Sequence, residues 1–180
     1  MKKILKNISC YYFNNHNEQI FLNHINKSDY KFILNCGTPR KLSCKFLYSS
    51  LMRVVNIHLE VLPDYRGSCC VERAILNIDE VGNIAHFMTN DYNEGPIIFI
   101  ENYNVKHQNN YIDVRFLVIK KWIGLMVKII DYLIGIYISK LSLRVLKGRY
   151  LYSPIPDDQL IIVKNKIKNF DRKNVDVSYN

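Results

Sequence analysis

The sequence lacks most of the short motifs that identify a catalytic or metal-binding site. It has no P-loop, no H-E-x-x-H zinc motif, no paired-carboxylate motif and no Ser, His and Asp in a hydrolase order. It also has no C-x-x-C pair, and its five cysteines are irregularly spaced: Cys10, Cys36, Cys44, Cys69 and Cys70. We therefore expect reduced, partly buried thiols in a cytoplasmic protein, with no metal site and no disulfide framework.

No segment has the composition of a secretory signal or of a membrane-spanning helix. The start, MKKILKNISC, is basic but has no sustained apolar core. The most apolar run, Trp122–Ile138, is interrupted by Lys128 and Asp131, whereas a spanning helix needs about 20 mostly apolar residues. This run predicts a core helix. A peripheral contact with a membrane, as a basic interfacial helix, is the alternative.

Acidic residues are the scarcer charge. The sequence has 16 Asp and Glu against 25 Lys and Arg, a net charge of +9, which favours an acidic partner. An acidic protein is favoured over nucleic acid, because the basic residues are spread along the chain and no aromatic-plus-basic nucleic-acid motif is present. The length of 180 residues predicts one domain, which we place at residues 1–163, followed by a basic, flexible tail at residues 164–180.

The clearest structural signal is Arg53–Gly67, RVVNIHLEVLPDYRG. Apolar and polar residues alternate in its first part, which is typical of a half-buried strand. Val55 and Ile57 are expected to point to one side of this strand, and Asn56 and His58 to the other. The strand is expected to end before the proline, which cannot donate to a β-ladder and begins a turn.

The remaining pattern predicts an α+β domain. Ile97–Val105 is expected to form a strand that carries one carboxylate, Glu101. Asn110–Ile138 has apolar residues at spacings of three and four, which predicts one long helix after that strand. Residues 69–88 have the pattern of a β-hairpin, in which Cys69–Ile78 is either the first strand or the start of a helix. Further strands are expected at residues 141–146 and 159–163. The predicted fold is a single α+β domain with a mixed, mostly antiparallel sheet.

The sequence Val61-Leu62-Pro63-Asp64-Tyr65-Arg66-Gly67 resembles the acetyl-CoA loop of the GNAT acyltransferases. In that family a strand ends in V-x-P and leads into a glycine-rich loop, whose backbone N–H groups hold a pyrophosphate. The resemblance implies a GNAT-like fold, with Arg66 and Gly67 at the binding site of the acyl donor. The second and third glycine positions of the loop are Cys69 and Val71 in this chain.

The order of motifs between residues 49 and 145 also resembles the toxin-activating, or hemolysin-activating, lysine acyltransferases. The matching segments are Ser49-Ser50-Leu51-Met52-Arg53, Val61-Leu62-Pro63 with Arg66, Phe99-Ile100-Glu101 and Arg144-Val145. This resemblance implies transfer of an acyl group to a protein amine from acyl carrier protein or acyl-CoA, with no resident cofactor required. The essential histidine of that family falls at Met52, and its aspartate falls at Glu101.

Under this hypothesis the candidate catalytic residues are His58, Glu101 and Ser50. His58 would deprotonate the acceptor amine, and Glu101 would orient its imidazole from the second strand. Alternatively, His58 is a half-exposed sheet histidine, and Glu101 is edge-exposed, paired with a Lys or Arg, or a carboxylate with a raised pKa. Ser50 lies in the serine segment of the resemblance; alternatively, it caps or turns the chain before the strand. Arg66 would receive the acidic donor. The alternative function is a non-catalytic binding or regulatory adaptor on a GNAT-like fold that recognises an acidic protein partner.

Overall fold

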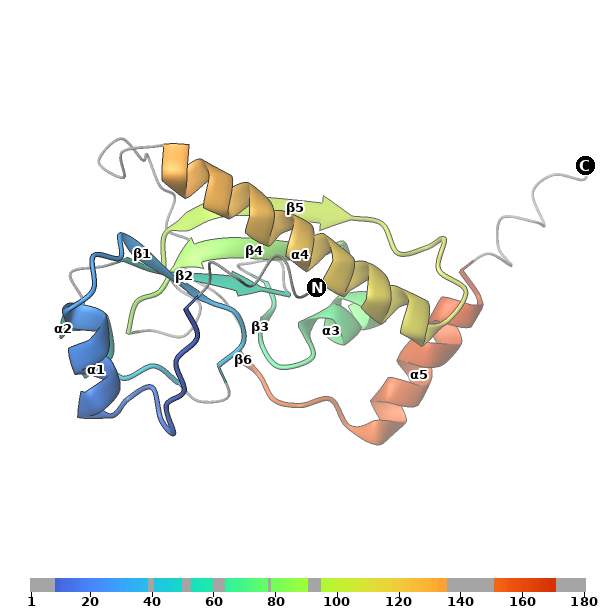
Figure 1. The fold of residues 1–180 in the computed structure, drawn as a ribbon. Coiled ribbons are helices and arrows are strands. Elements are labelled where there is room, and N and C mark those ends of the chain that lie inside the picture. Colours follow the sequence, from blue (N-terminus) through green and yellow to red (C-terminus); the bar gives the residue numbers. More distant parts are fainter. Residues whose placement is uncertain are drawn as a thin grey trace, which may run out of the picture.

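A mixed β-sheet forms the centre of the molecule. The computed structural model describes residues 9–38, 41–49, 53–59, 64–77, 79–90, 95–135 and 151–170. The strands of the main sheet are β1 (Phe32–Asn35), β2 (Arg53–His58), β4 (Val81–Phe87) and β5 (Ile97–Tyr103). They lie side by side in the order β1-β2-β4-β5 (Figure 1). β1 runs parallel to β2, and the other two neighbouring pairs are antiparallel.

Helices cover both faces of this sheet. α4 (Tyr111–Gly135) lies along one face, where its Leu125 packs in one cluster with Val55 of β2. α1 (Gln19–Asn26) and α2 (Cys44–Ser49) lie at the β1 end, where Phe46 packs in a second cluster with Val54 (Figure 1). Because successive strand residues point to opposite faces, the neighbours Val54 and Val55 belong to two different layers.

A third cluster packs one helix from the middle of the chain and one from its C-terminal part against the first half of α4. It is built by α3 (Cys70–Asn77) and α5 (Asp157–Lys168), with Ala74, Val114 and Val163 buried in it. The short parallel ladder of β3 (Arg66–Gly67) and β6 (Leu151–Tyr152) precedes these two helices. Gly67 is required in the ladder, because its φ is +99° and a Cβ there would lie 2.3 Å from the Tyr152 carbonyl oxygen.

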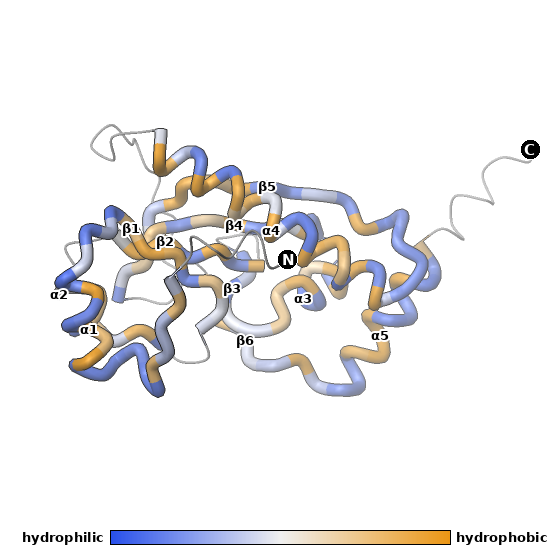
Figure 2. The backbone as a smooth tube through the Cα atoms, viewed as in Figure 1, coloured by the Kyte–Doolittle hydropathy of each residue, from blue (hydrophilic) through white to orange (hydrophobic). Residues whose placement is uncertain are grey.

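The strongest sequence patterns are confirmed. The helix predicted over residues 110–138 is α4, and the strand predicted over residues 97–105 is β5. β2 begins at Arg53 as predicted but ends at His58. Apolar residues concentrate along the central strands, whereas the connection from β5 to α4 is largely hydrophilic (Figure 2).

The hairpin predicted at residues 69–88 is wrong in its first half, where the alternative of a helix start is confirmed by α3, whereas its second strand corresponds to β4. The strand predicted at residues 159–163 is wrong, because this segment belongs to α5. In the first segment, Val71, Ala74 and Ile75 have helical spacing and form the buried face of α3. In the second, two aspartates at the start of α5 favour a helix N-terminus. α5 also extends to Lys168, beyond the predicted start of the tail at residue 164.

The strand predicted at residues 141–146 lies outside the described residues. Within the described part of the chain, no helix has the length and apolar character needed to cross a membrane.

Candidate active site

A row of three polar side chains crosses the sheet from β1 to β4. Asn35 is opposite Asn56 in the register of β1 and β2, and Asn56 is opposite His86 in the register of β2 and β4. Asn35 Nδ2 donates a hydrogen bond to Asn56 Oδ1 at 2.9 Å, and Asn56 Nδ2 lies 3.2 Å from His86 Nε2. Asn56 and His86 are 6% and 1% exposed, so this row is a buried hydrogen-bond chain.

The contacts of His86 fix the direction of the hydrogen bonds in this row. Its Nδ1 lies 3.0 Å from the backbone carbonyl oxygen of Phe87, which can only accept, so Nδ1 carries the proton. Burial lowers the pKa of His86 to about 4; the hydrogen bond to Phe87 partly opposes this shift, and the nearby His58 adds to it. His86 is therefore neutral near pH 7, and its Nε2 accepts from Asn56. The second amide hydrogen of Asn56 is left for another acceptor.

His58 lies two residues after Asn56, on the same face of β2. Its side chain is half-buried, and both residues line a cavity of about 810 Å³. The position of β2 beside this cavity is fixed from the other face by Trp122 of α4, whose Nε1 donates a 2.9 Å hydrogen bond to the carbonyl oxygen of Ile57. Trp122 also lines the cavity.

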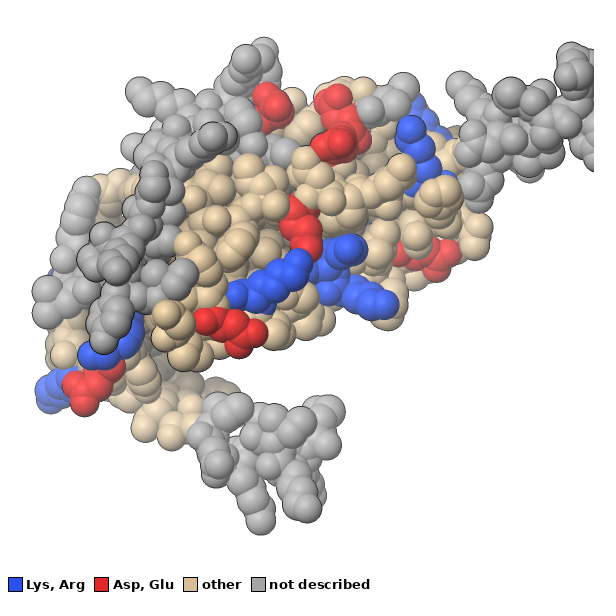
Figure 3. All heavy atoms as spheres, turned by 90° about the horizontal axis from the view of Figure 1, so that it is seen from above, with Lys and Arg blue, Asp and Glu red and all other residues tan. Residues whose placement is uncertain are grey.

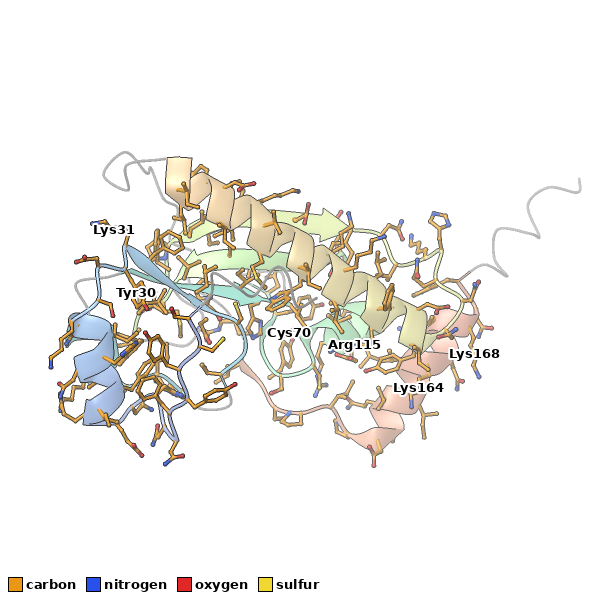
Figure 4. The ribbon with its side chains drawn as sticks, viewed as in Figure 1. Tyr30, Lys31, Cys70, Arg115, Lys164 and Lys168 are labelled. Atoms are coloured by element: carbon orange, nitrogen blue, oxygen red, sulfur yellow. The ribbon has the colours of Figure 1, made fainter. Side chains whose placement is uncertain are left out.

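The two ends of the cavity differ in chemistry. The end beside β1 and α2 is lined by apolar and short polar side chains and by a lysine: Thr38, Lys41, Leu42, Leu47, Met88 and Thr89. The other end is formed by the turn and first residues of α3, from Gly67 to Glu72, and by Tyr111 and Arg115 of α4. Figure 4 labels Cys70 and Arg115, which line this second end from α3 and α4.

A buried carboxylate lies at the second end. Glu72 is 3% exposed, and its Oε1 accepts hydrogen bonds from the Tyr111 hydroxyl at 2.6 Å and from Arg115 at 3.3 Å. Burial, followed by the hydrogen bond to Glu72, raises the pKa of Tyr111, so Tyr111 remains a phenol that donates. Glu72 Oε2 is also buried and has no hydrogen-bond partner among the described residues.

Asn56 and His58 together have the chemistry needed for reactions at a carbonyl group. Asn56 is held on both sides by Asn35 and His86, so its remaining N–H is a fixed donor for an oxygen that gains negative charge. An imidazole two residues away is a suitable group for moving a proton at neutral pH. One cavity thus contains both a hydrogen-bond donor for an oxyanion, Asn56, and an acid–base group, His58.

The structure does not bring the two central predicted residues together. His58 is opposite Ile84 in the β-ladder, whereas Glu101 is opposite Asn83, the neighbouring residue of β4. His58 and Glu101 therefore point to opposite faces of the sheet. Glu101 instead forms an ion pair with Lys128 of α4 at 2.5 Å, so its predicted role in orienting His58 is wrong.

The other predicted site residues have different outcomes. Gly67 lines the cavity at the start of its polar end, but it belongs to the β3 ladder. Two residues later, Cys69 is a non-glycine residue with a φ of +56°. Arg66 lies beside it in β3 and is half-buried. Ser50 lies outside the described residues.

Reasoning from the sequence missed Asn56, His86 and Asn35 as site residues. The signal for Asn56 was present, because the alternation in β2 places it on the same face as His58. His86 and Asn35 carry no such signal, since they come from separate segments and meet Asn56 only through the order of strands in the sheet.

Comparisons with known proteins agree on one family. The sequence model of the formyl transferase family matches residues 9–118. A methionyl-tRNA formyltransferase from Hydrogenobaculum sp. (strain Y04AAS1) is 34% identical over 58 residues, which are 32% of this chain and 19% of that protein. A formyltetrahydrofolate deformylase from Bacillus subtilis (strain 168) is 34% identical over 70 residues, 38% of this chain and 23% of that protein.

Among solved structures, a 4-N formyltransferase from Francisella tularensis has a similar fold. It superimposes with a TM-score of 0.61 and 25% sequence identity, over 74% of this chain and 53% of that one. The mixed sheet with helices on both faces is thus the Rossmann-like formyltransferase fold. Since the family match covers residues 9–118, more than half of the sequence, the chain belongs to the formyl transferase family. The chain spans about a fifth of the length of the two curated relatives and about half of the solved structure.

Membership of this family corrects four predictions made from the sequence. The GNAT-like fold and the resemblance to the toxin-activating acyltransferases are wrong, because the stretch from Arg53 to Gly67 lies within the formyl transferase match. Transfer of an acyl group from acyl carrier protein to a protein amine is wrong for the same reason. So is the alternative of an adaptor on a GNAT-like fold. The strand, the proline-containing turn and Arg66-Gly67 match the GNAT pattern over a short stretch, and this local match caused the error.

Proposed function

We propose that this chain binds a formyltetrahydrofolate-type donor in the cavity and that Asn56 and His58 act on its formyl group. The observation that carries the proposal is the fixed N–H of Asn56 beside His58, in a cavity of a formyl transferase family member. The similarity to the formyltetrahydrofolate deformylase from Bacillus subtilis supports the choice of donor.

The size and lining of the cavity fit such a donor. A volume of about 810 Å³ is within the range of about 300–1,000 Å³ that is usual for sites of medium-sized ligands. Leu42, Leu47 and Met88 at the β1–α2 end offer apolar contacts for a flat ring system. Asn56 and His58 provide the polar groups in the middle of the cavity, where a formyl group attached to such a ring system would lie.

Each of the two residues has a defined chemical role. The donor supplies an activated formyl group. Asn56 donates its second amide hydrogen to the formyl oxygen, where negative charge develops as the acceptor attacks the carbon. His58 takes the proton that the attacking group loses and can return it to the leaving nitrogen of the donor. Both residues are preorganised by β2, whose position is fixed by Asn35, His86 and Trp122.

Water is the second candidate for the attacking group. The deformylase from Bacillus subtilis is as similar in sequence as the methionyl-tRNA formyltransferase, and its name describes removal of the formyl group. With water as acceptor, the same two residues would release formate.

Five free cysteines agree with a cytoplasmic location, which we include in this proposal.

The experiment measures donor binding and donor turnover separately. Trp122 is the only tryptophan and lines the cavity, so quenching of its fluorescence by formyltetrahydrofolate reports binding. Tetrahydrofolate release, with and without amine acceptors, reports turnover. We expect Asn56→Ala and His58→Ala each to lower the turnover rate by about 100-fold or more while donor binding persists. The exposed His107→Ala is the matched control and should keep the wild-type rate. Wild-type turnover in Asn56→Ala, or no donor binding by the wild type, contradicts the proposal.

A further inference from the structure

The long helix α4 is apolar on two sides, and only one of them is buried. Its buried residues pack in the clusters shared with the sheet, α3 and α5: Val114, Val118, Leu125, Ile129 and Leu133. Six more large apolar side chains of α4 are between 46% and 76% exposed, and we call them the outer stripe: Ile112, Phe116, Ile119, Ile123, Val127 and Ile134. A surface helix normally has one apolar face, so a second apolar side indicates a second contact.

The outer stripe is narrow, straight and long. At 100° per residue its six positions fall within an arc of about 80°, and they span about 33 Å along the helix axis. Together they leave on the order of 600 Å² of apolar surface in water. The largest apolar patch of a typical monomer covers about 300–600 Å², and a stable dimer buries about 800 Å² per partner with the polar rim included. The stripe is therefore large enough to form the centre of a dimer interface.

The order of residues in the stripe favours a second copy of this chain as the partner. With the half-buried Ile130 included, successive positions are four, three, four, four, three and four residues apart, which reads the same from either end. A two-fold dimer requires this property, because each contact occurs twice with the residues exchanged. If two copies of α4 cross antiparallel at Ile123, Ile112 faces Ile134 of the second copy and Ile119 faces Val127.

A membrane surface fits the stripe less well. Asp113 and Asp131 lie at the same edge of the stripe, since they are 18 residues, or five helical turns, apart. Both carboxylates would be brought close to anionic headgroups if the stripe entered a membrane. In a helix pair, side chains at this edge point sideways and stay in water at the rim of the contact.

We propose that the outer stripe is the interface of a homodimer, in which α4 packs antiparallel against α4 of a second copy with the two-fold axis at Ile123. Phe116 of each copy then packs against Ile130 of the other. This inference goes beyond the proposed function and does not depend on it, because no donor or acceptor takes part in the contact.

The first test places a charge on the two-fold axis. Ile123→Lys brings two ammonium groups together in an apolar contact, which should raise the dissociation constant of the dimer by about 100-fold or more. Ile162→Lys on α5 is the matched control, since Ile162 and Ile123 are 48% and 50% exposed. Sedimentation equilibrium of the full chain over a range of concentrations gives the dissociation constants. We expect a wild-type dimer, an unchanged constant in the control and the same far-UV circular dichroism for both variants.

The second test determines the direction of the helix pair. With p-benzoylphenylalanine in place of Phe116, ultraviolet light should link the dimer covalently, and tryptic peptides show where. The antiparallel contact predicts a link from peptide 116–120 to peptide 129–140, which contains Ile130. Residues 116 and 130 of one helix are about 21 Å apart, so this link forms only between two copies.

Four results would overturn the inference. They are a wild-type chain that stays monomeric at every concentration, a dimer that Ile123→Lys does not weaken, a link from residue 116 to peptide 116–120 of the second copy, and a monomer that binds anionic vesicles unless Ile123 is changed to Lys. The last result would assign the stripe to a membrane surface. None of these measurements involves turnover, so they leave the proposed function to its own test.

Discussion

Acid should destabilise this protein through His86. In the unfolded chain this imidazole has a pKa near 6.5, whereas burial lowers it to about 4 in the fold. Between these two values the unfolded chain binds a proton that the folded protein excludes, so the free energy of unfolding falls as the pH is lowered. A difference of 2.5 pKa units (6.5 − 4) corresponds to about 3 kcal/mol over the full range. At pH 5 the same two values predict a loss of about 2 kcal/mol relative to pH 7.5.

The assay is urea denaturation at pH 7.5, 6, 5 and 4.5, with the wild type and His86→Gln compared at each pH. The glutamine can donate to Phe87 and accept from Asn56 but does not titrate, so the variant should lack the His86 part of the pH slope. His107→Gln, at an exposed histidine, controls for the loss of an imidazole and should keep the wild-type slope. Parallel stability curves for the wild type and His86→Gln would refute a neutral, buried His86.

Two further predictions test the assignment of residues and of backbone conformation. Glu101→Gln should leave donor turnover unchanged, because Glu101 lies on the face opposite His58. It should lower the free energy of unfolding by less than about 1 kcal/mol in urea denaturation, because its ion-pair partner Lys128 is 60% exposed. A large loss of turnover would show that Glu101 belongs to the site. Gly67→Ala should lower the thermal midpoint by about 4–8 °C, because a residue with φ of +99° would place its Cβ 2.3 Å from Tyr152 O. Gly124→Ala is the control, since a Cβ there meets no atom within 4 Å, and in mid-helix it should raise the midpoint.

The long helix and the central strands could be predicted because their periodicity is local. Val55 and Ile57 alternate with Asn56 and His58 within one segment, and the face of each follows from the pleat alone. The sequence does not decide between a strand and a helix start for α3, because eight residues hold only two helical turns and an apolar segment of that length fits both. Element type in such short segments is decided by packing, here against α4 and α5.

The site could be predicted only in part, because its residues are distant in the sequence. His58 was recognised as a candidate from a single strand. Glu101 was assigned as its partner because both lie on central strands, but strand order and register place them on opposite faces. Asn35 reaches Asn56 through a parallel pairing of β1 and β2, and no pattern in either segment specifies that pairing.

Charge was a weak guide to the partner. The net charge of +9 favours an acidic partner, yet basic and acidic side chains are interspersed on the face seen in Figure 3. The cavity gives a more specific constraint. Its polar residues include the Asn56 amide, the His58 imidazole and the Glu72 carboxylate, all within the same lining.

The arrangement of the sheet explains how the side-chain amide of Asn56, a weak hydrogen-bond donor, could stabilise an oxyanion on a bound ligand. An asparagine side chain normally rotates and exchanges its partners with water, and reorienting it during a reaction costs free energy. In this fold both sides of Asn56 are occupied by cross-strand neighbours in register, so the amide is already oriented before a ligand enters. The neutral state of His86 is essential to this, because a protonated ring would donate from Nε2 and oppose the Asn56 N–H. The pH that destabilises the fold should therefore also disorient Asn56, and loss of turnover in acid should accompany the loss of stability.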